Sequence, residues 1–185
     1  MTLDLQPTLF GPQLLLRPLE PADREALYAV ASDPLIWADH PAHDRHLPAV
    51  FERYFDEAIA SGGALLAVES ASNAAIGSSR FSFEFAQPGE VEIGWTFLAR
   101  QHWGGPMNRE MKRLMLRHAF TEVETAMFRV AEQNVRSRRA MEKIGARLTE
   151  RRESASVGGR DVIHVIYTIA RADFLHSPLN LEGAA

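Results

Sequence analysis

The residues with the clearest chemistry form a glycine turn between a strand pattern and a helix pattern, within residues 90–120. Gly104 and Gly105 precede Pro106, which suits the first turn of a helix. The N–H groups at such a helix start have no partner within the helix and lie at the positive end of its dipole, an arrangement that binds phosphate. Residues 100–117 contain five Lys/Arg and one acid, a local charge of +4 in a chain of net charge −4.

The elements on either side of this turn follow from their apolar periods. Val91, Ile93, Trp95 and Phe97 alternate with Glu90, Glu92, Gly94 and Thr96, which predicts a strand with one apolar face and Glu92 on the other face. After the turn, one helical stripe holds Met107, Met111, Leu114, Met115, His118 and Ala119. The stretch therefore predicts a strand, a phosphate-binding turn and a helix, although an ordinary strand–helix unit with a basic face has the same pattern.

Two common nucleotide motifs do not fit the turn. A Walker motif needs Gly-Lys-Ser/Thr at the helix start, where this chain has Gly105-Pro106-Met107-Asn108. A dinucleotide motif needs three spaced glycines, and only two are present. The phosphate ligand therefore belongs to another class.

A second motif lies about 30 residues further on. Asn134 and Ser137 open a predicted helix that ends with Glu142-Lys143-Ile144-Gly145. Together with Gln101-x-x-Gly104-x-Pro106, it resembles motifs A and B of the GNAT superfamily, the acetyl-CoA-dependent N-acetyltransferases. The Trp103-Gly104 pair and the His118-Ala119-Phe120 helix end resemble the RimJ/RimL branch. The chain departs from the family pattern at Pro106, where the family has Gly or Ala, and at Ala146, where it has Phe.

The resemblance covers nearly the whole chain and implies an α+β fold. Its sheet would be mixed, twisted and mostly antiparallel, with about seven strands and about four flanking helices. The first expected helix begins at Pro21 and ends near Asp33-Pro34. The other expected helices span residues 47–61, 106–120 and 134–144. One expected strand, residues 75–85, carries Phe81, Phe83 and Phe85 as core side chains, and residues 148–153 and 161–170 form a closing hairpin.

The resemblance also implies site roles. The residues expected to hold acetyl-CoA are Arg100, Gln101, Gly104, Gly105, Met107, Asn108, Arg109 and Asn134. The resemblance assigns the general base to Glu92, with Glu90 as the fallback, whereas the bare strand pattern fits a surface carboxylate equally well. Relatives often use a tyrosine as the acid. The motif B helix has none, so the proton donor is Ser137 or solvent.

The polar residues of the loop 37–46 fit a solvated loop, whereas the resemblance implies that this loop lines the acceptor pocket, through Trp37 and His40. His40, His43, His46, Asp39 and Asp44 are also metal-ligand types, but they lack ligand spacing on a rigid element, so we expect no metal.

The composition sets the remaining expectations. A chain of 185 residues, 46% apolar, predicts one domain, 1–185, with residues 171–185 an ordered start followed by a loose tail. The absence of cysteine excludes an acyl-cysteine route, and with the lack of a signal or membrane segment it favours a cytoplasmic protein. The resemblance implies acetyl transfer to an amine acceptor, a small molecule or a protein N-terminus, and without cysteine direct attack is the simpler route. We also allow for a homodimer.

Two alternatives remain. Pro106 and the missing tyrosine are compatible with a protein that binds CoA without catalysis. Residues 129–152 hold eight basic and three acidic residues, which is compatible with a nucleic-acid-binding module, although no aromatic pattern accompanies them and the pI is near 6.

Overall fold

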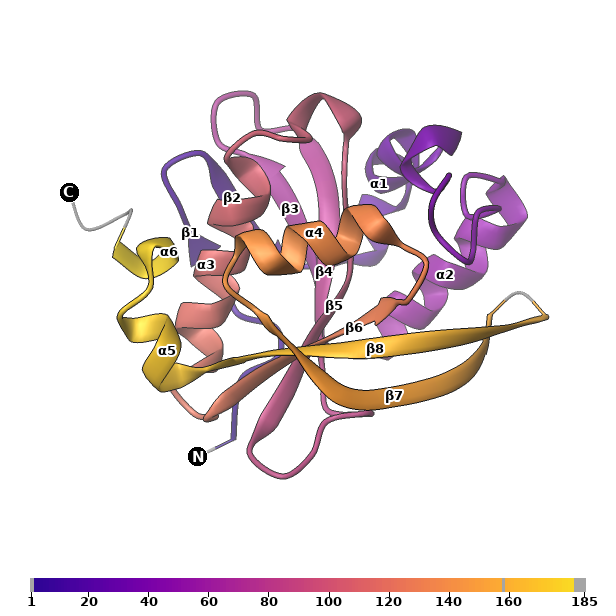
Figure 1. The fold of residues 1–185 in the computed structure, drawn as a ribbon. Helices are drawn as coiled ribbons and strands as arrows, with labels where there is room; N and C mark the ends of the chain where they lie inside the picture. The colour runs from indigo at the N-terminus through magenta and orange to yellow at the C-terminus, as the bar shows by residue number, and fades with distance from the viewer. Residues whose placement is uncertain (1, 158, 182–185) are drawn as a thin grey trace.

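A single mixed sheet of eight strands organises the computed structural model, which describes residues 2–157 and 159–181 (Figure 1). The strand order is β1-β2-β3-β4-β5-β6-β8-β7, and every neighbouring pair is antiparallel except β5 and β6. The strands are β1 Leu9–Phe10, β2 Leu14–Pro18, β3 Ala64–Glu69, β4 Ala75–Ser82, β5 Glu90–Leu98, β6 Thr125–Ala131, β7 Arg147–Val157 and β8 Arg160–Ala170. The expected α+β class is confirmed. The additional strand is the two-residue β1, which lies in a lead too short to show a period.

Four helices of eight residues or more flank the sheet, as predicted. They are α1 Arg24–Ala31, α2 Pro48–Ala60, α3 Met107–Ala119 and α4 Val135–Lys143. Proline opens α2 and caps α3, where a missing N–H costs nothing. Three short 3₁₀ turns, η1 Pro21–Asp23, η2 Pro34–Ile36 and η3 Arg100–His102, complete the connections before α3.

The helices cover the sheet through two separate cores. Met111, Met115 and Leu116 of α3 pack on one face with Val91 and Ile93 of β5. On the other side, α1 and α2 pack through a cluster that includes Leu27, Phe51, Phe55 and Phe97. Figure 1 shows the α1–α2 pair and α3 on opposite sides of the central strands. Strand β5 contributes to both cores, so the residues on it are positioned from both directions.

A β-bulge in β5 corrects the predicted alternation. The register with β4 pairs Arg80 with Gly94 and Ser78 with Phe97, so Ser79 faces two β5 residues, Trp95 and Thr96. Trp95 has φ +52°, a strained value for a residue with a side chain. The extra residue reverses the side-chain parity. Val91 and Ile93 therefore lie in the α3 core, whereas Trp95 and Phe97 lie in the α1–α2 core.

The phenylalanine row of residues 81–85 is only partly core. Strand β4 ends at Ser82, so Phe81 is fully buried but Phe83 and Phe85 are 42% and 36% exposed. The prediction that all three are core residues is wrong. Phe85 instead covers the guanidinium of Arg129, which lies 3.7 Å from its ring centroid.

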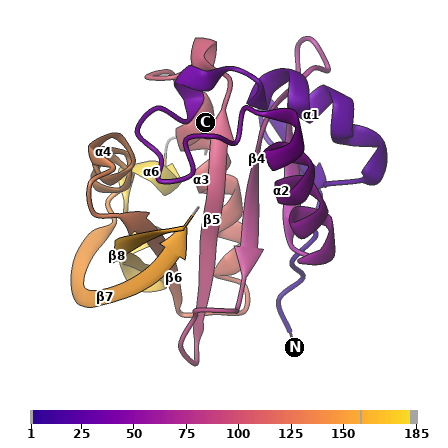
Figure 2. The ribbon, with the colours of Figure 1, turned by 90° about the vertical axis from the view of Figure 1, so that its right-hand side faces the viewer.

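The parallel pair β5–β6 is short, and this creates the opening that the site uses. Its register runs only from Glu90–Thr125 to Glu92–Met127, and no pairing follows although both strands continue. Figure 2 shows β5 crossing the middle of the molecule, with β6 and the β7–β8 hairpin to one side of it. The separation of the two strands beyond residue 92 leaves room between them.

The C-terminal segment continues past β8 as two short helices, α5 Arg171–Leu175 and α6 Pro178–Leu181. Phe174 and Leu179 are buried in the α3 core, and the Arg117 side chain binds Asn180. The ordered start expected for this segment therefore extends to residue 181, and the rest of the expected tail, 182–185, lies outside the described residues. No helix among residues 2–157 and 159–181 is long and apolar enough to cross a membrane.

Candidate acetyl-transfer site

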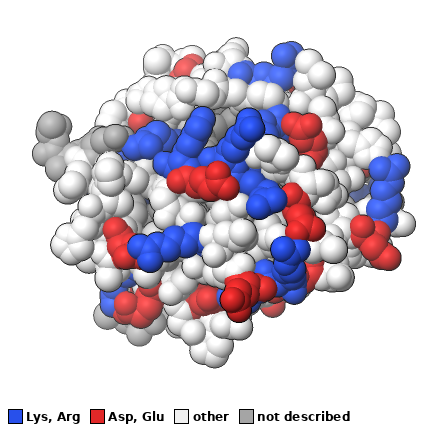
Figure 3. All heavy atoms as spheres, viewed as in Figure 1, with Lys and Arg blue, Asp and Glu red and all other residues white. Residues whose placement is uncertain are grey.

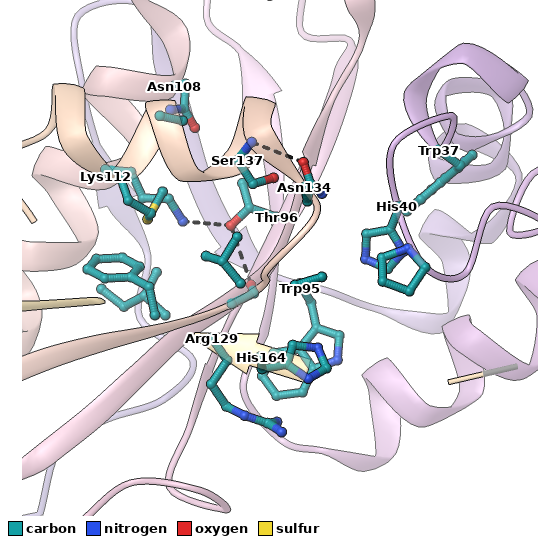
Figure 4. Close-up of a pocket in the computed structure, with 18 of the residues that line it drawn as sticks. Trp37, His40, Trp95, Thr96, Asn108, Lys112, Arg129, Asn134, Ser137 and His164 are labelled. Carbon is teal, nitrogen blue, oxygen red and sulfur yellow. Dashed lines mark hydrogen bonds between the residues drawn. The ribbon is translucent and has the colours of Figure 1, made fainter. Parts of the chain in front are cut away.

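A cavity of about 170 Å³ lies where β5 and β6 separate (Figure 4). Its walls come from the bulged part of β5, the second half of β6, the starts of α3 and α4, and the loop before α2. The lining residues are Trp37, His40, Pro41, Arg45, Ile93, Gly94, Trp95, Thr96, Asn108, Lys112, Phe128, Arg129, Val130, Ala131, Asn134, Ser137, Ala140, Met141 and His164. The cavity thus brings together residues from both motifs and from the predicted acceptor loop.

The glycine turn before α3 has the geometry of an anion site. Gly104 has φ +72°, a conformation that suits glycine, and a Cβ built there would meet no atom within 4 Å. The first helical bond runs from the Glu110 N–H to the Pro106 carbonyl, so the N–H groups of Met107 and Asn108 have no acceptor inside the helix. The Gly105 N–H, in contrast, donates a long bond of 3.4 Å to the His102 carbonyl.

The side chains predicted to bind at this turn lie in different surroundings, some exposed and one buried. Arg100 is ion-paired with Asp33, and Gln101 is exposed beside His102. The side chain of Met107 is buried in the core, and Arg109 donates to the Lys143 carbonyl at 3.5 Å. Of the predicted α3 set, only Asn108 lines the cavity. Any contact of the other residues with the coenzyme would therefore be at the turn, outside this cavity.

Asn134 caps α4 and lines the cavity at the same time. Its Oδ1 accepts the Ser137 N–H at 3.0 Å, and its side chain is buried. Ser137 also lines the cavity, and Figure 4 shows Asn134, Ser137 and Thr96 close together. The N-cap bond uses the amide oxygen of Asn134 and leaves its NH₂ group as a donor for a ligand.

Glu92 is buried, with 3% of its surface exposed, so the surface-carboxylate interpretation is wrong. Its Oε1 lies 3.0 Å from the point that a Cβ on Gly94 would occupy, and Gly94 lines the cavity although Glu92 does not. Its Oε2 has no hydrogen-bond partner in the described chain. Burial raises the pKa of Glu92 to about 7, although Arg129 opposes the shift.

Glu90, the fallback base, is held in place by an ion pair and a backbone hydrogen bond. Both of its carboxylate oxygens accept from Arg151 Nη1 at 2.9 Å, and one also accepts the Gln87 N–H. Glu90 lies two residues further from the bulge and does not line the cavity. The geometry therefore gives Glu92, not Glu90, the position beside the site.

Trp37 and His40 approach the cavity from the loop before α2, as Figure 4 shows. The Trp37 indole N–H donates to the Ala31 carbonyl at 2.7 Å, which fixes the ring over α1. His40 Nδ1 accepts the Ala42 N–H at 3.0 Å, and burial lowers the pKa of His40 to about 3. His40 is therefore a neutral imidazole whose other ring nitrogen, Nε2, carries the proton.

Lys112 is the functional candidate that the sequence analysis missed. It is 1% exposed, and its Nζ lies 2.6 Å from Thr96 Oγ1 and 3.5 Å from Ser79 Oγ (Figure 4). No acid pairs with it in the part of the chain described, and burial lowers its pKa to about 7. A signal existed, since Lys112 is one turn after Asn108 on the same helical face.

Three further side chains of the cavity were also missed, Arg45, Arg129 and His164. Arg129 and His164 come from the neighbouring strands β6 and β8 (Figure 4). Arg129 Nε lies 2.8 Å from Glu153 Oε2, an ion-pair distance at an angle that makes no hydrogen bond. His164 Nδ1 is buried without a partner in residues 2–157 and 159–181. Only the tertiary fold brings these residues together, so no local pattern marks them.

Half of the basic residues in the segment 129–152 form ion pairs with acidic residues of the protein. Arg129, Arg151 and Arg152 form ion pairs with Glu153, Glu90 and Glu132, respectively. Figure 3 shows Lys and Arg side chains gathered in a band over α4, with acidic side chains beside them. These internal pairs leave less free charge for nucleic acid than the sequence count indicates. Among the described residues, no group of three or more His, Cys, Asp or Glu is arranged to hold a metal.

Comparison with known proteins decides the family. Residues 13–147 match the model of the acetyltransferase (GNAT) domain, which covers more than half of the chain. The chain belongs to the GNAT acetyltransferase family. It is an N-acetyltransferase, and the family's acetyl donor is acetyl-CoA, in agreement with the sequence analysis. No curated protein matches its sequence.

Solved structures agree in fold at low identity. A GCN5-related N-acetyltransferase from Brucella melitensis has a TM-score of 0.83 at 20% identity, over 97% of this chain and 84% of that one. RimJ from Mycobacterium smegmatis, in complex with CoA-disulfide, has 0.72 at 18%, over 100% and 97%. Spermidine N-acetyltransferase from Vibrio cholerae, in complex with CoA and spermine, has 0.65 at 18%, over 90% and 100%. At identities of 18–20%, these likenesses show the shared fold.

Proposed function

We propose that this GNAT protein transfers the acetyl group of acetyl-CoA to a primary amine by direct attack within a ternary complex. One observation carries the proposal: Asn108, Asn134 and Ser137, at the helix starts of the two motifs, and Trp37 and His40, in the acceptor loop, line the same cavity. Donor and acceptor can therefore meet without a covalent intermediate on the protein. The chain also has no cysteine to carry an acyl group.

The donor fits the residues at one end of the site. The glycine turn offers backbone N–H groups at the positive end of α3 to the pyrophosphate. Pro106 supplies no such donor, so the turn relies on its neighbours. Asn134 keeps its NH₂ for the pantetheine arm, since its Oδ1 caps α4. The unpaired register of β5 and β6 leaves space for that arm between the strands.

Glu92 is the proposed base. Its carboxyl group lies behind Gly94, which has no side chain to separate it from the cavity. A proton from the attacking amine passes to Glu92, directly or through one water, as the C–N bond forms. A pKa near 7 leaves a large fraction of Glu92 ionised at neutral pH while keeping it basic enough to accept the proton.

The leaving thiolate takes its proton as the C–S bond breaks. Ser137 is the proposed donor because it lines the cavity one turn into α4, and solvent is the alternative source. The backbone N–H groups of Trp95 and Thr96 are the proposed donors to the negative charge on the carbonyl oxygen, because these two residues have no partner in the register with β4.

Two measurements test the proposal. Acetyl-CoA at about 100 times its Kd should stabilise the fold by about 2.7 kcal/mol and raise the melting temperature. A panel of amines, followed by thiol release and mass spectrometry, should identify an acceptor that gains 42 Da, roughly the mass of an acetyl group less a proton. Acetyl-CoA binding without turnover on any amine would instead favour a CoA-binding protein without catalysis.

A further inference from the structure

The acceptor end of the cavity, which we define as His40, Arg45, Trp95, Arg129 and His164, is basic. Across the whole lining there are three Lys or Arg side chains and two His, and none of the lining residues is Asp or Glu. A cationic acceptor such as a polyamine would need carboxylates in this wall, because a buried ammonium group without an acid partner costs several kcal/mol.

Arg45 is the central cation of this end. Its guanidinium lies 4.7 Å from the Tyr54 ring centroid and 5.5 Å from that of Trp37, so two aromatic faces hold it in place. Within residues 2–157 and 159–181 it makes no ion pair, and burial lowers its pKa. Asp44 and Glu57 act on it only through space. Its hydrogen-bond donors are therefore available to a ligand.

Arg80 adds a second guanidinium behind the wall. It is 6% exposed and lies 4.6 Å from the ring centroid of Trp95, which lines the cavity. Its Nε and Nη2 are buried with no hydrogen-bond partner in the described chain. Arg80 also lowers the pKa of Arg45, because the two positive charges repel one another. Glu92 attracts Arg80 through space but does not bond to it.

Arg80 is a buried guanidinium with unused donors, and Arg45 is a partly buried one without an ion pair among the described residues, so an anion at this end of the cavity would offset their desolvation. A carboxylate matches the fork of a guanidinium and neutralises its charge. We infer that the acceptor is a small amine that also carries a carboxylate, an amino-acid-like molecule, which binds with its carboxylate toward Arg45. This inference rests on the proposed function, because the carboxylate only positions the amine that attacks the thioester.

The size of the cavity agrees with a small molecule. About 170 Å³ can hold the reacting end of the donor together with a small acceptor. Gly94, behind which Glu92 lies, lines the same cavity as Arg45, so a carboxylate bound at Arg45 keeps the amino group in the space that the base adjoins. In the reaction the C–N bond forms, the C–S bond breaks, the amine proton passes to the base, and the carboxylate is unchanged.

The experiment compares acceptors that differ only in the anion. Amino acids, their amides and spermidine are assayed with acetyl-CoA by thiol release. We expect the free acids to exceed their amides in kcat/KM by about 10–100-fold, the effect of losing a charge-assisted hydrogen-bond pair. Arg45→Met should remove this preference and Arg45→Lys should keep part of it. The matched control, Arg147→Met, removes an exposed arginine paired with Asp173 and should keep the preference in full. Amides or spermidine that match the free acids would overturn the inference.

A binding measurement separates this inference from the proposed function. N-acetyl amino acids and their amides are titrated by calorimetry into the protein with CoA present, so no turnover is needed. Tighter binding of the acids, lost in Arg45→Met, supports the carboxylate site even if no acetyl transfer is found. Equal binding of acids and amides would overturn the site even if some amine is acetylated.

Discussion

Replacing Lys112 by methionine should make the protein more stable at neutral pH and less sensitive to pH. Its amine is buried, and its hydrogen-bond partners among the described residues are the hydroxyls of Thr96 and Ser79. Burial lowers its pKa from 10.5 to about 7, whereas the unfolded chain keeps the ordinary value. Between pH 7 and about 10.5 the unfolded chain therefore binds more protons than the folded one. The free energy of unfolding rises with pH across that window, by roughly 1 kcal/mol per pH unit.

The size of the effect at pH 7 follows from the same two pKa values. A difference of about 3.5 pKa units corresponds to a cost on the order of 4 kcal/mol for burying this amine. Methionine has a similar length and would pack against Phe128, whose ring centroid lies 5.7 Å from Nζ. The lost bond to Thr96 costs about 1–2 kcal/mol. Lys112→Met should therefore be more stable than the wild type by about 1–3 kcal/mol at pH 7.

Urea unfolding at pH 7, 8 and 9 measures this effect. The stability advantage of Lys112→Met should shrink by roughly 1 kcal/mol per pH unit as the wild-type lysine loses its proton. The control is Lys143→Met, which changes the only other lysine of the chain, an exposed residue at the end of α4. Parallel pH curves for Lys112→Met and the wild type would refute the reasoning, because they would mean that the buried amine keeps its ordinary pKa.

Three further predictions concern the donor and the wall of the site. Gly104→Asp should weaken acetyl-CoA binding in calorimetry by at least about tenfold, and by more than Gly104→Ala, because the added carboxylate repels the pyrophosphate. The control for backbone strain is Gly62→Asp, since Gly62 has a similar φ of +63°. Asn134→Asp should keep the cap and the melting temperature but lower turnover, and intact turnover would contradict its role with the pantetheine arm. Gly94→Ala should lower kcat without loss of acetyl-CoA affinity, because its Cβ would lie 3.0 Å from the Glu92 carboxyl group; an unchanged kcat would mean that the carboxyl position does not matter.

The sequence was most informative where local chemistry repeats a common pattern. The period of α3, the glycine turn before it and the N-cap of α4 were all predicted within a few residues, because each depends on neighbours in the chain. Asn134 and Ser137 therefore lie beside the site as the motif order implied.

The bulge in β5 was not predictable from alternation. A strict period of two places Trp95 with Val91 and Ile93, whereas one extra residue opposite Ser79 moves it to the other core. The same reasoning failed at Phe83 and Phe85, because the strand ends before them and alternation alone does not mark a strand end.

The basic wall of the cavity was the least predictable feature. Arg45, Lys112 and His164 come from a loop, a helix and a distant strand, and each has an ordinary local context. Their role can be inferred only from the fold, which places them around one cavity whose lining includes no Asp or Glu. In the sequence, the histidines of the loop 37–46 were the candidates for chemistry. In the structure, Arg45 beside them lines the cavity and is the stronger candidate for binding the acceptor.

The most direct test of the account is the pH dependence of kcat/KM for Glu92→Gln with an identified acceptor. The pKa of Glu92 is raised to about 7, so its basic form increases with pH, and wild-type activity should rise through that region. Lys112→Met should keep this rise, which separates the two buried groups that titrate near pH 7. Glu92→Gln should bind acetyl-CoA normally, lose about 10²–10⁴-fold in rate near neutrality, and approach the wild type at high pH, where the amine is already deprotonated. Wild-type rates and an unchanged profile in Glu92→Gln would contradict the assignment of the base.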